Sequence, residues 1–130
     1  MSPREQPDPR PTARVLGGSH ELVVDSLSLD EDSFTVRYTV SPPLPEGLEG
    51  GSPVLLALEA RDDVGNEYTD WGGAYGLSDD GGHTDGAITG RPAVAPSARV
   101  LAVRLTFLWE GREYPCELPL QVPGTRPDSD

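Results

Sequence analysis

Lysine is missing altogether from this chain, so all ten of its basic side chains are arginines. They are outnumbered by 22 acidic residues, and the formal net charge is −12. A surface of this charge repels the phosphates of nucleic acids and the headgroups of anionic membranes. No apolar run approaches the ~20 residues that a membrane-spanning helix needs. We therefore expect neither nucleic acid nor a membrane as a partner.

Cysteine is almost absent as well. Cys116 is the one cysteine of the chain, so no internal disulfide can form, whereas a small secreted domain usually carries several. No apolar stretch follows the first charged residues, and the sequence therefore shows no secretory signal. Together, these two absences predict a cytoplasmic protein.

The length of 130 residues suits a single domain. Residues 1–18 combine four prolines with charged residues and few apolar side chains, so this proline- and arginine-containing segment is predicted to be a disordered tail. Residues 123–130 have the same character and are predicted to be a disordered acidic tail. The folded domain is accordingly expected to cover residues 19–122.

Within residues 19–122, apolar side chains recur at every second position, which is the period of a β-strand. Three such rows each predict a strand with one face in the core. The rows are Phe34, Val36, Tyr38 and Val40, then Leu101, Val103, Leu105, Phe107 and Trp109, and finally Tyr114, Cys116, Leu118 and Leu120.

Details of these segments predict where individual strands lie. Pro115 and Pro119 lie on the outward face of the last row, which indicates an edge strand because proline lacks a ladder donor. Residues 54–58 are apolar at every position, as expected of a central strand covered on both faces. The apolar positions of residues 21–29 change parity near Asp25, which predicts a β-bulge there.

Polar turn sequences at 30–33, 62–66 and 110–112 separate the predicted strands. Seven or eight short antiparallel strands in about a hundred residues are typical of a Greek-key, immunoglobulin-like β-sandwich. That is the fold class we predict, and a small β-barrel is the alternative.

The stretch from Phe34 to Tyr68 resembles small immunoglobulin-like β-sandwich proteins of unknown function from actinobacteria. It contains an Asp-x-x-Gly-x-x-Tyr element, with Asp62, Gly65 and Tyr68 at the three positions. In those proteins the element often forms a hairpin that ends on an inward tyrosine, and the Trp-Gly-Gly at 71–73 is similar to some members. The resemblance implies a fold without an activity, because a shared sandwich does not transfer function.

An unusual segment follows this element, in which an aromatic residue stands beside two glycines. Aromatic side chains presented at a loop are frequent protein contacts. The candidate binding residues in and beside this 69–85 loop region are Trp71, Tyr75, Leu77 and Arg91. The favoured alternative makes Trp71 a plug of the core, because large aromatics in small sandwiches mostly pack. If one of the two aromatics is exposed, we expect Tyr75 rather than Trp71.

Acidic residues surround the same segment, and Ca²⁺ is bound by oxygen ligands. The candidate calcium ligands are Asp70, Asp79, Asp80 and Asp85. The acidic spacing does not match the calcium-loop pattern of alternating ligands, and aspartate beside glycine also forms ordinary turns. Solvated turn residues are thus the favoured interpretation, and no cofactor is expected. His83 is interpreted as a loop residue.

Catalytic motifs are missing from the sequence. The obvious nucleophile, Cys116, shares its parity with core residues, and a thiol buried in that way is inert. Neither a Gly-x-Ser-x-Gly element nor a phosphate-binding glycine loop is present. We therefore predict that the chain is not an enzyme.

Three functions stay open at this point. The first is a non-enzymatic module that binds another protein, and a basic partner would be favoured electrostatically. The second is a calcium-dependent binding domain that uses the acidic residues around the 69–85 segment. The third is a structural subunit of a larger assembly.

Overall fold

The computed structural model describes residues 11–44 and 54–122. The tail predictions for residues 1–10 and 123–130 lie outside the described residues. In the described ranges, no helix has the length and apolar character needed to span a membrane.

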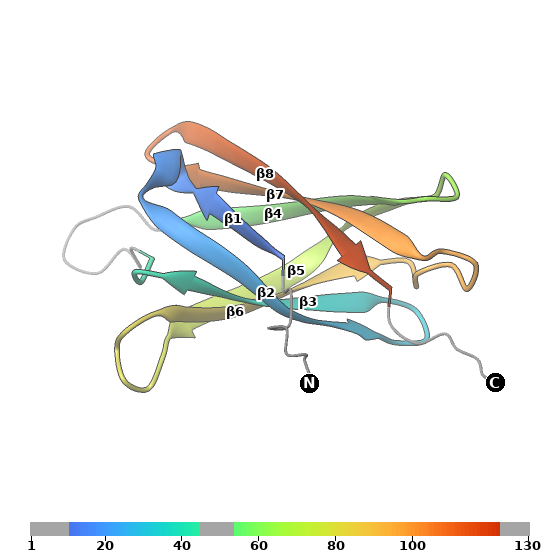
Figure 1. The fold of residues 1–130 in the computed structure, drawn as a ribbon, viewed down its shortest axis with the longest axis horizontal. Coiled ribbons are helices and arrows are strands. Elements are labelled where there is room, and N and C mark those ends of the chain that lie inside the picture. Colours follow the sequence, from blue (N-terminus) through green and yellow to red (C-terminus); the bar gives the residue numbers. More distant parts are fainter. Residues whose placement is uncertain (1–10, 45–53, 123–130) are drawn as a thin grey trace, which may run out of the picture.

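The described residues form one sheet of eight strands in which every pair of neighbours is antiparallel (Figure 1). The order across the sheet is β1-β2-β3-β6-β5-β4-β7-β8. The strands are β1 (Thr12–Val15), β2 (His20–Leu29), β3 (Phe34–Ser41), β4 (Leu55–Asp62), β5 (Glu67–Leu77), β6 (Thr84–Arg91), β7 (Val100–Trp109) and β8 (Arg112–Gln121), and a 3₁₀ turn, η1 (Leu16–Gly18), follows β1.

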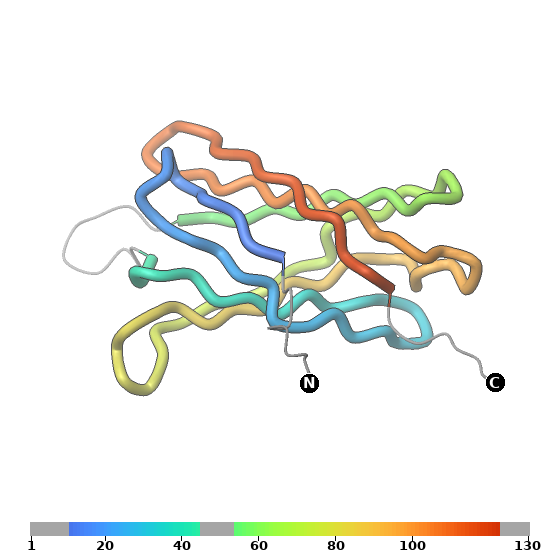
Figure 2. The backbone as a smooth tube through the Cα atoms, in the orientation of Figure 1, coloured from blue at the N-terminus to red at the C-terminus, as the bar shows by residue number. Residues whose placement is uncertain are grey.

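The sheet curls into two facing layers. Figure 1 shows β4, β7 and β8 in the upper layer and β3 and β6 in the lower one, while β5 runs from the first layer to the second. The first and last strands of the sheet, β1 and β8, come close to each other, so the sheet nearly closes (Figure 2). The prediction of an all-β antiparallel fold is confirmed.

The core lies between the layers and follows the predicted period of two. On β3 all four predicted residues are buried, and on β7 the residues from Leu101 to Phe107 are buried at every second position. β8 ends the sheet and pairs only with β7, which confirms the predicted edge strand. The register of β2 shifts between Val24 and Ser26, which confirms the bulge near Asp25.

Two predictions about strands are wrong in part. The first strand lies inside the segment predicted to be disordered: Thr12 to Val15 pair with β2, and Val15 and Leu16 are buried. The fold therefore begins before residue 19, because pairing satisfies the backbone and two apolar side chains reach the core. β4 is central, as predicted, but Leu55 is 60% exposed, because within residues 11–44 and 54–122 no layer covers the outer face of this strand.

Glycine at position 90 is required by the packing of Phe34. A Cβ at Gly90 would overlap the ring of the fully buried Phe34, whereas a Cβ at Gly76 would meet no atom within 4 Å. We expect Gly90→Ala to lower the free energy of unfolding by about 1–3 kcal/mol through overpacking. Gly76→Ala should leave it unchanged or raise it by up to about 1 kcal/mol. Urea unfolding measures both, and equal effects would contradict this packing.

Candidate binding surface

The turn between β4 and β5 is built around a buried carboxylate, that of Asp62. Its Oδ1 accepts hydrogen bonds from the backbone N–H of Val64 at 3.0 Å and of Asn66 at 2.8 Å. Its Oδ2 accepts from the Asn66 side-chain amide at 2.9 Å and from the Tyr68 hydroxyl at 2.7 Å. Gly65 supplies the positive φ of +98° that the turn needs. The predicted Asp-x-x-Gly-x-x-Tyr hairpin is confirmed in this way.

These bonds set the acidity of Asp62. Burial by itself would raise the pKa of this carboxyl, but the hydrogen bonds from Asn66, Tyr68 and Val64 outweigh it and lower the pKa from 3.8 to about 2. Asp62 is therefore ionised at neutral pH, and its charge stabilises the turn.

Tyr68 extends the same network to a third segment. Its hydroxyl oxygen accepts a hydrogen bond from the backbone N–H of Ala95 at 3.0 Å, in the connection before β7. Its ring meets that of Phe34 edge-on, with the centroids 5.5 Å apart and the planes at 87°. Burial raises the pKa of Tyr68, so the hydroxyl keeps the proton that it donates to Asp62.

The pairing between β5 and β4 ends soon after the turn around Asp62, which we call the Asp62 corner. The two strands pair from Glu67 to Thr69, and beyond Thr69 the strand that pairs with β5 among the described residues is β6. Asp70 lies at the point of departure, where its Oδ2 accepts from the Leu58 N–H at 2.9 Å and its Oδ1 from the Gly72 N–H at 2.6 Å. The register of β5 shifts between Asp70 and Gly72, and this bulge carries Trp71.

Trp71 lies on the surface, with 64% of its area exposed. The guanidinium carbon of Arg91 lies 4.3 Å from the centroid of the indole ring, which is a cation–π contact. Arg91 is itself held by the β2–β3 turn, since its Nε donates to the Asp32 carbonyl oxygen at 3.3 Å and its second terminal nitrogen lies 3.5 Å from the Asp32 carboxylate. The indole ring is thus exposed, with one face against the Arg91 guanidinium.

The structure corrects three predictions about these side chains. Trp71 is not a core plug, because the bulge turns it outward. Tyr75, expected to be the more exposed aromatic, is half-buried, and its hydroxyl donates to the Val54 carbonyl oxygen. The 69–85 segment is also no loop: it is most of the β5–β6 hairpin, with its turn at residues 78–83.

Of the four candidate binding residues, Arg91 and Trp71 contact each other. Arg91 is paired in register with Thr69 and lies beside Trp71, whereas Leu77 is paired with Thr84 at the opposite end of the hairpin. Leu77 is 54% exposed. The sequence could not show which of these residues lie together, because the register between β5 and β6 sets their separation.

Three of the four candidate calcium ligands, Asp70, Asp80 and Asp85, already make local polar contacts. Asp70 binds backbone N–H groups through both oxygens, as described above. Asp80 accepts from the Ser78 hydroxyl at 2.7 Å and from the Gly82 N–H at 2.9 Å, and these bonds, the Gly82 bond foremost, lower its pKa. Asp79 is exposed in the same turn. Across residues 11–44 and 54–122, no three metal-ligating side chains form a group that could hold an ion.

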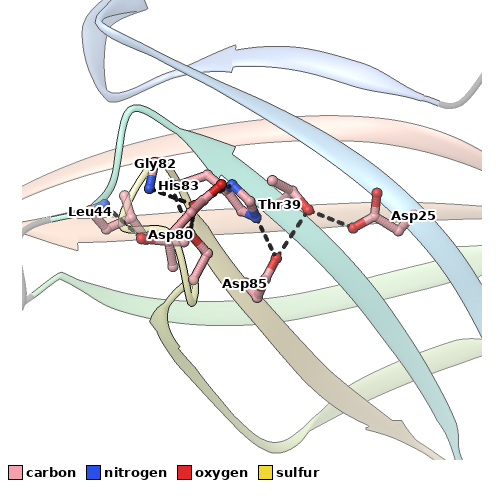
Figure 3. A network of polar contacts seen from close by, with 9 residues as sticks. Asp25, Thr39, Leu44, Asp80, Gly82, His83 and Asp85 are labelled. Carbon is pink, nitrogen blue, oxygen red and sulfur yellow. Dashed lines mark hydrogen bonds and ion pairs between the residues drawn. The ribbon is translucent and has the colours of Figure 1, made fainter.

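One polar pair was missed in the sequence, where His83 and Asp85 stand two residues apart. His83 Nε2 lies 3.2 Å from an Asp85 oxygen, and the same oxygen accepts a hydrogen bond from Thr39 at 3.4 Å (Figure 3). Thr39 also donates to Asp25 at 2.7 Å. These contacts connect β6 to β3 and β2 on the exposed face of the sheet.

Cys116 is half-buried rather than fully enclosed. Burial raises the pKa of its thiol, so the nucleophilic thiolate is disfavoured at neutral pH. The side chain lies on β8 opposite Leu105, in the row where it was predicted.

A cavity of about 290 Å³ opens where β4 and β5 diverge. Most of its lining is apolar, and it lies beside the exposed Leu55. The lining residues are Tyr38, Val54, Leu55, Leu56, Gly73, Ala74, Tyr75, Ala87 and Ile88. No sequence pattern predicts this cavity, because it arises where two strands separate after three paired residues.

The charge of Asp62 makes the free energy of unfolding depend on pH. Asp62→Asn should lower the free energy of unfolding at neutral pH by about 2 kcal/mol or more, because an amide cannot accept from all four donors. With a folded pKa of about 2 against 3.8 ordinarily, the contribution of Asp62 is complete above about pH 5 and is lost as the pH falls towards 2. Urea unfolding at several pH values should show the gap between the two proteins closing in acid. A constant gap would contradict this.

Trp71 should contribute little to stability. We expect Trp71→Ala to lower the free energy of unfolding by less than about 1 kcal/mol, since it removes one exposed cation–π contact. Phe34→Ala, which deletes a fully buried ring, should cost about 3–5 kcal/mol in the same assay. A loss above about 2 kcal/mol for Trp71→Ala would mean that the ring supports the fold.

No known protein family matches this chain, and no curated protein or solved structure does either. The geometry of the described side chains is therefore the basis on which a function can be proposed.

Proposed function

We propose that this chain is a non-enzymatic, protein-binding module whose contact surface is the β5–β6 hairpin around Trp71. The observation that carries the proposal is the 64% exposure of a tryptophan whose ring stacks against Arg91. Tryptophan and arginine dominate the binding energy of protein interfaces, because each buries a large area against a partner.

Preorganisation supports the same function. Arg91 stacks on the ring, and Asp32 holds Arg91 through two contacts. A side chain that is already ordered loses less entropy on binding than a mobile one. Association therefore keeps more of the free energy gained when the indole leaves water.

The surface beside Trp71 lets a partner approach closely. Next to Trp71, Thr35 and Thr89 hydrogen-bond to each other at 3.1 Å across β3 and β6, and the exposed Arg37 of β3 is paired with Ala87. Gly72 and Ala74 continue these rows on β5, paired with Thr89 and Ala87. The small residues Gly72, Ala74 and Thr89 beside the ring allow a partner's backbone to come near it.

The charge of the chain favours a basic partner. Its net charge is −12, and Asp32 and Asp70 lie next to the Trp71 surface. Complementary charge speeds association and rejects acidic partners more than it tightens the complex. Asp70 and Asp80 already bond backbone N–H groups, which favours a structural role for them over calcium binding.

For the architecture, we propose an immunoglobulin-like Greek-key sandwich in which β5 belongs to both layers. The pairings of β3 with β6 and of β4 with β7 support it, because each joins strands that are distant in the sequence. The single cysteine supports a cytoplasmic location.

Affinity capture from a lysate of the source organism tests the function. The wild-type chain and Arg104→Ala, which changes an exposed arginine on β7, should retain the same basic protein. Trp71→Ala and Arg91→Ala should lose it, since they remove the ring and its support. If all four baits retain the same proteins, or the wild type retains none specifically, this function is wrong.

A further inference from the structure

We infer that the partner contacts Trp71 through an arginine side chain, which stacks on the face of the indole ring opposite Arg91. The inference rests on the proposed function and specifies the partner as a protein with an exposed basic segment. Three features of the surface support it: the contact between the ring and Arg91, the exposed area of the ring, and the carboxylates around it.

The ring of Trp71 already binds one guanidinium group. The guanidinium carbon of Arg91 lies 4.3 Å from the ring centroid. Both faces of an indole carry the same negative charge density, and tryptophan attracts cations more strongly than tyrosine or phenylalanine does. Because 64% of Trp71 is exposed although Arg91 covers one face, much of the opposite face is in contact with solvent. The ring can therefore accept a second cation.

Carboxylates are the prevailing charged groups beside the ring. The β2–β3 turn lies next to Arg91, because its Asp32 contacts the guanidinium group. The exposed Arg37 lies farther from the bulge, since it is aligned through β6 with Ala74 of β5. The carboxylates of the turn and of the bulge belong to Asp30, Glu31, Asp32 and Asp70.

The β2–β3 turn retains charge that can attract a partner. Asp32 pairs with Arg91 and offsets its charge. The side chains of Asp30 and Glu31 are exposed and form no hydrogen bond or ion pair with any described residue. Charges act over a Debye length of about 8 Å at physiological ionic strength. A basic segment is thus attracted to this end of the hairpin, whereas a second copy of the chain would add a further −12 of net charge.

Stacking on a single ring favours arginine over other cations. A guanidinium group is planar and weakly hydrated, so it lies flat on an aromatic face, whereas the ammonium group of lysine is compact and strongly hydrated. Quaternary ammonium ligands are typically enclosed by a cage of several aromatic rings. Tyr75, the next aromatic residue along β5, is half-buried and donates to the Val54 carbonyl oxygen, so it does not complete such a cage.

The probe is a displayed library of random peptides selected on the whole chain. We expect the selected peptides to share an arginine and to carry a positive net charge. In one synthesised peptide, each arginine is then replaced in turn by citrulline, which keeps the planar shape and removes the charge. One of these replacements should raise the Kd at least about tenfold, and Trp71→Leu should do the same with the unmodified peptide.

Combining the two changes tests for direct contact. If the replaced arginine lies on Trp71, each change removes the same interaction, and the combined loss should fall short of the product of the two losses by at least about fivefold. Leu77→Ala is the control, because it changes another exposed apolar side chain of β5. Its effect on the Kd should be the same for both peptides. Thermal unfolding confirms that the variants fold.

The acidic turn is tested separately. Asp30→Asn combined with Glu31→Gln removes two charges and leaves the contacts of Arg91 with Asp32 in place. We expect this variant to raise the Kd about threefold or more at low salt and less at high salt, chiefly by slowing association. An unchanged Kd at low salt would contradict the role given to the turn.

Three results would overturn the inference: no selected peptide, selected peptides without arginine, or independent effects of citrulline and Trp71→Leu. Trp71→Leu also separates this inference from the proposed function. Binding that depends on Trp71 but is coupled to a residue other than arginine would keep the function and reject the arginine contact. Binding that neither Trp71→Leu nor Arg91→Ala weakens would reject both.

Discussion

The hydrogen-bonded carboxylate of Asp62 is the interaction on which the arrangement of this molecule depends. A buried charge is tolerated only where donors surround it, and here four donors do so. Three of them come from the β4–β5 turn, and the fourth, the Tyr68 hydroxyl, also binds Ala95 before β7. One carboxylate thereby joins the end of β4, the start of β5 and a connection between the layers.

The direction of β5 follows from this corner. β5 pairs with β4 over three residues and then turns away to pair with β6. Where the two strands separate, Asp70 accepts a hydrogen bond from the Leu58 N–H. The departure has two consequences on the surface. A bulge places Trp71 outside, under Arg91, and the divergence of the strands opens an apolar cavity. The same bend that lets one strand serve both layers thus creates the candidate binding surface.

Local patterns predicted most of the fold and little of the site. The alternation of apolar and polar residues predicted β3 and β7, and the Asp-x-x-Gly-x-x-Tyr element at Asp62 predicted the β4–β5 hairpin. Both patterns depend on residues that are close together in the sequence. The four-residue β1 was missed, since its order comes from pairing with β2 rather than from its own composition. Trp71 was placed inside because the bulge that reverses its direction depends on the partner strand. The cavity depends on where two strands separate, which no short segment encodes.

The most direct measurement of the central claim is the solvent access of Trp71 in a chain carrying Trp109→Phe, which leaves it as the one tryptophan. If β5 turns away from β4 as described, fluorescence should be emitted near the wavelength of tryptophan in water. Acrylamide should quench it almost as efficiently as the free amino acid. A blue-shifted emission that acrylamide barely quenches would place the ring in the core and contradict the account.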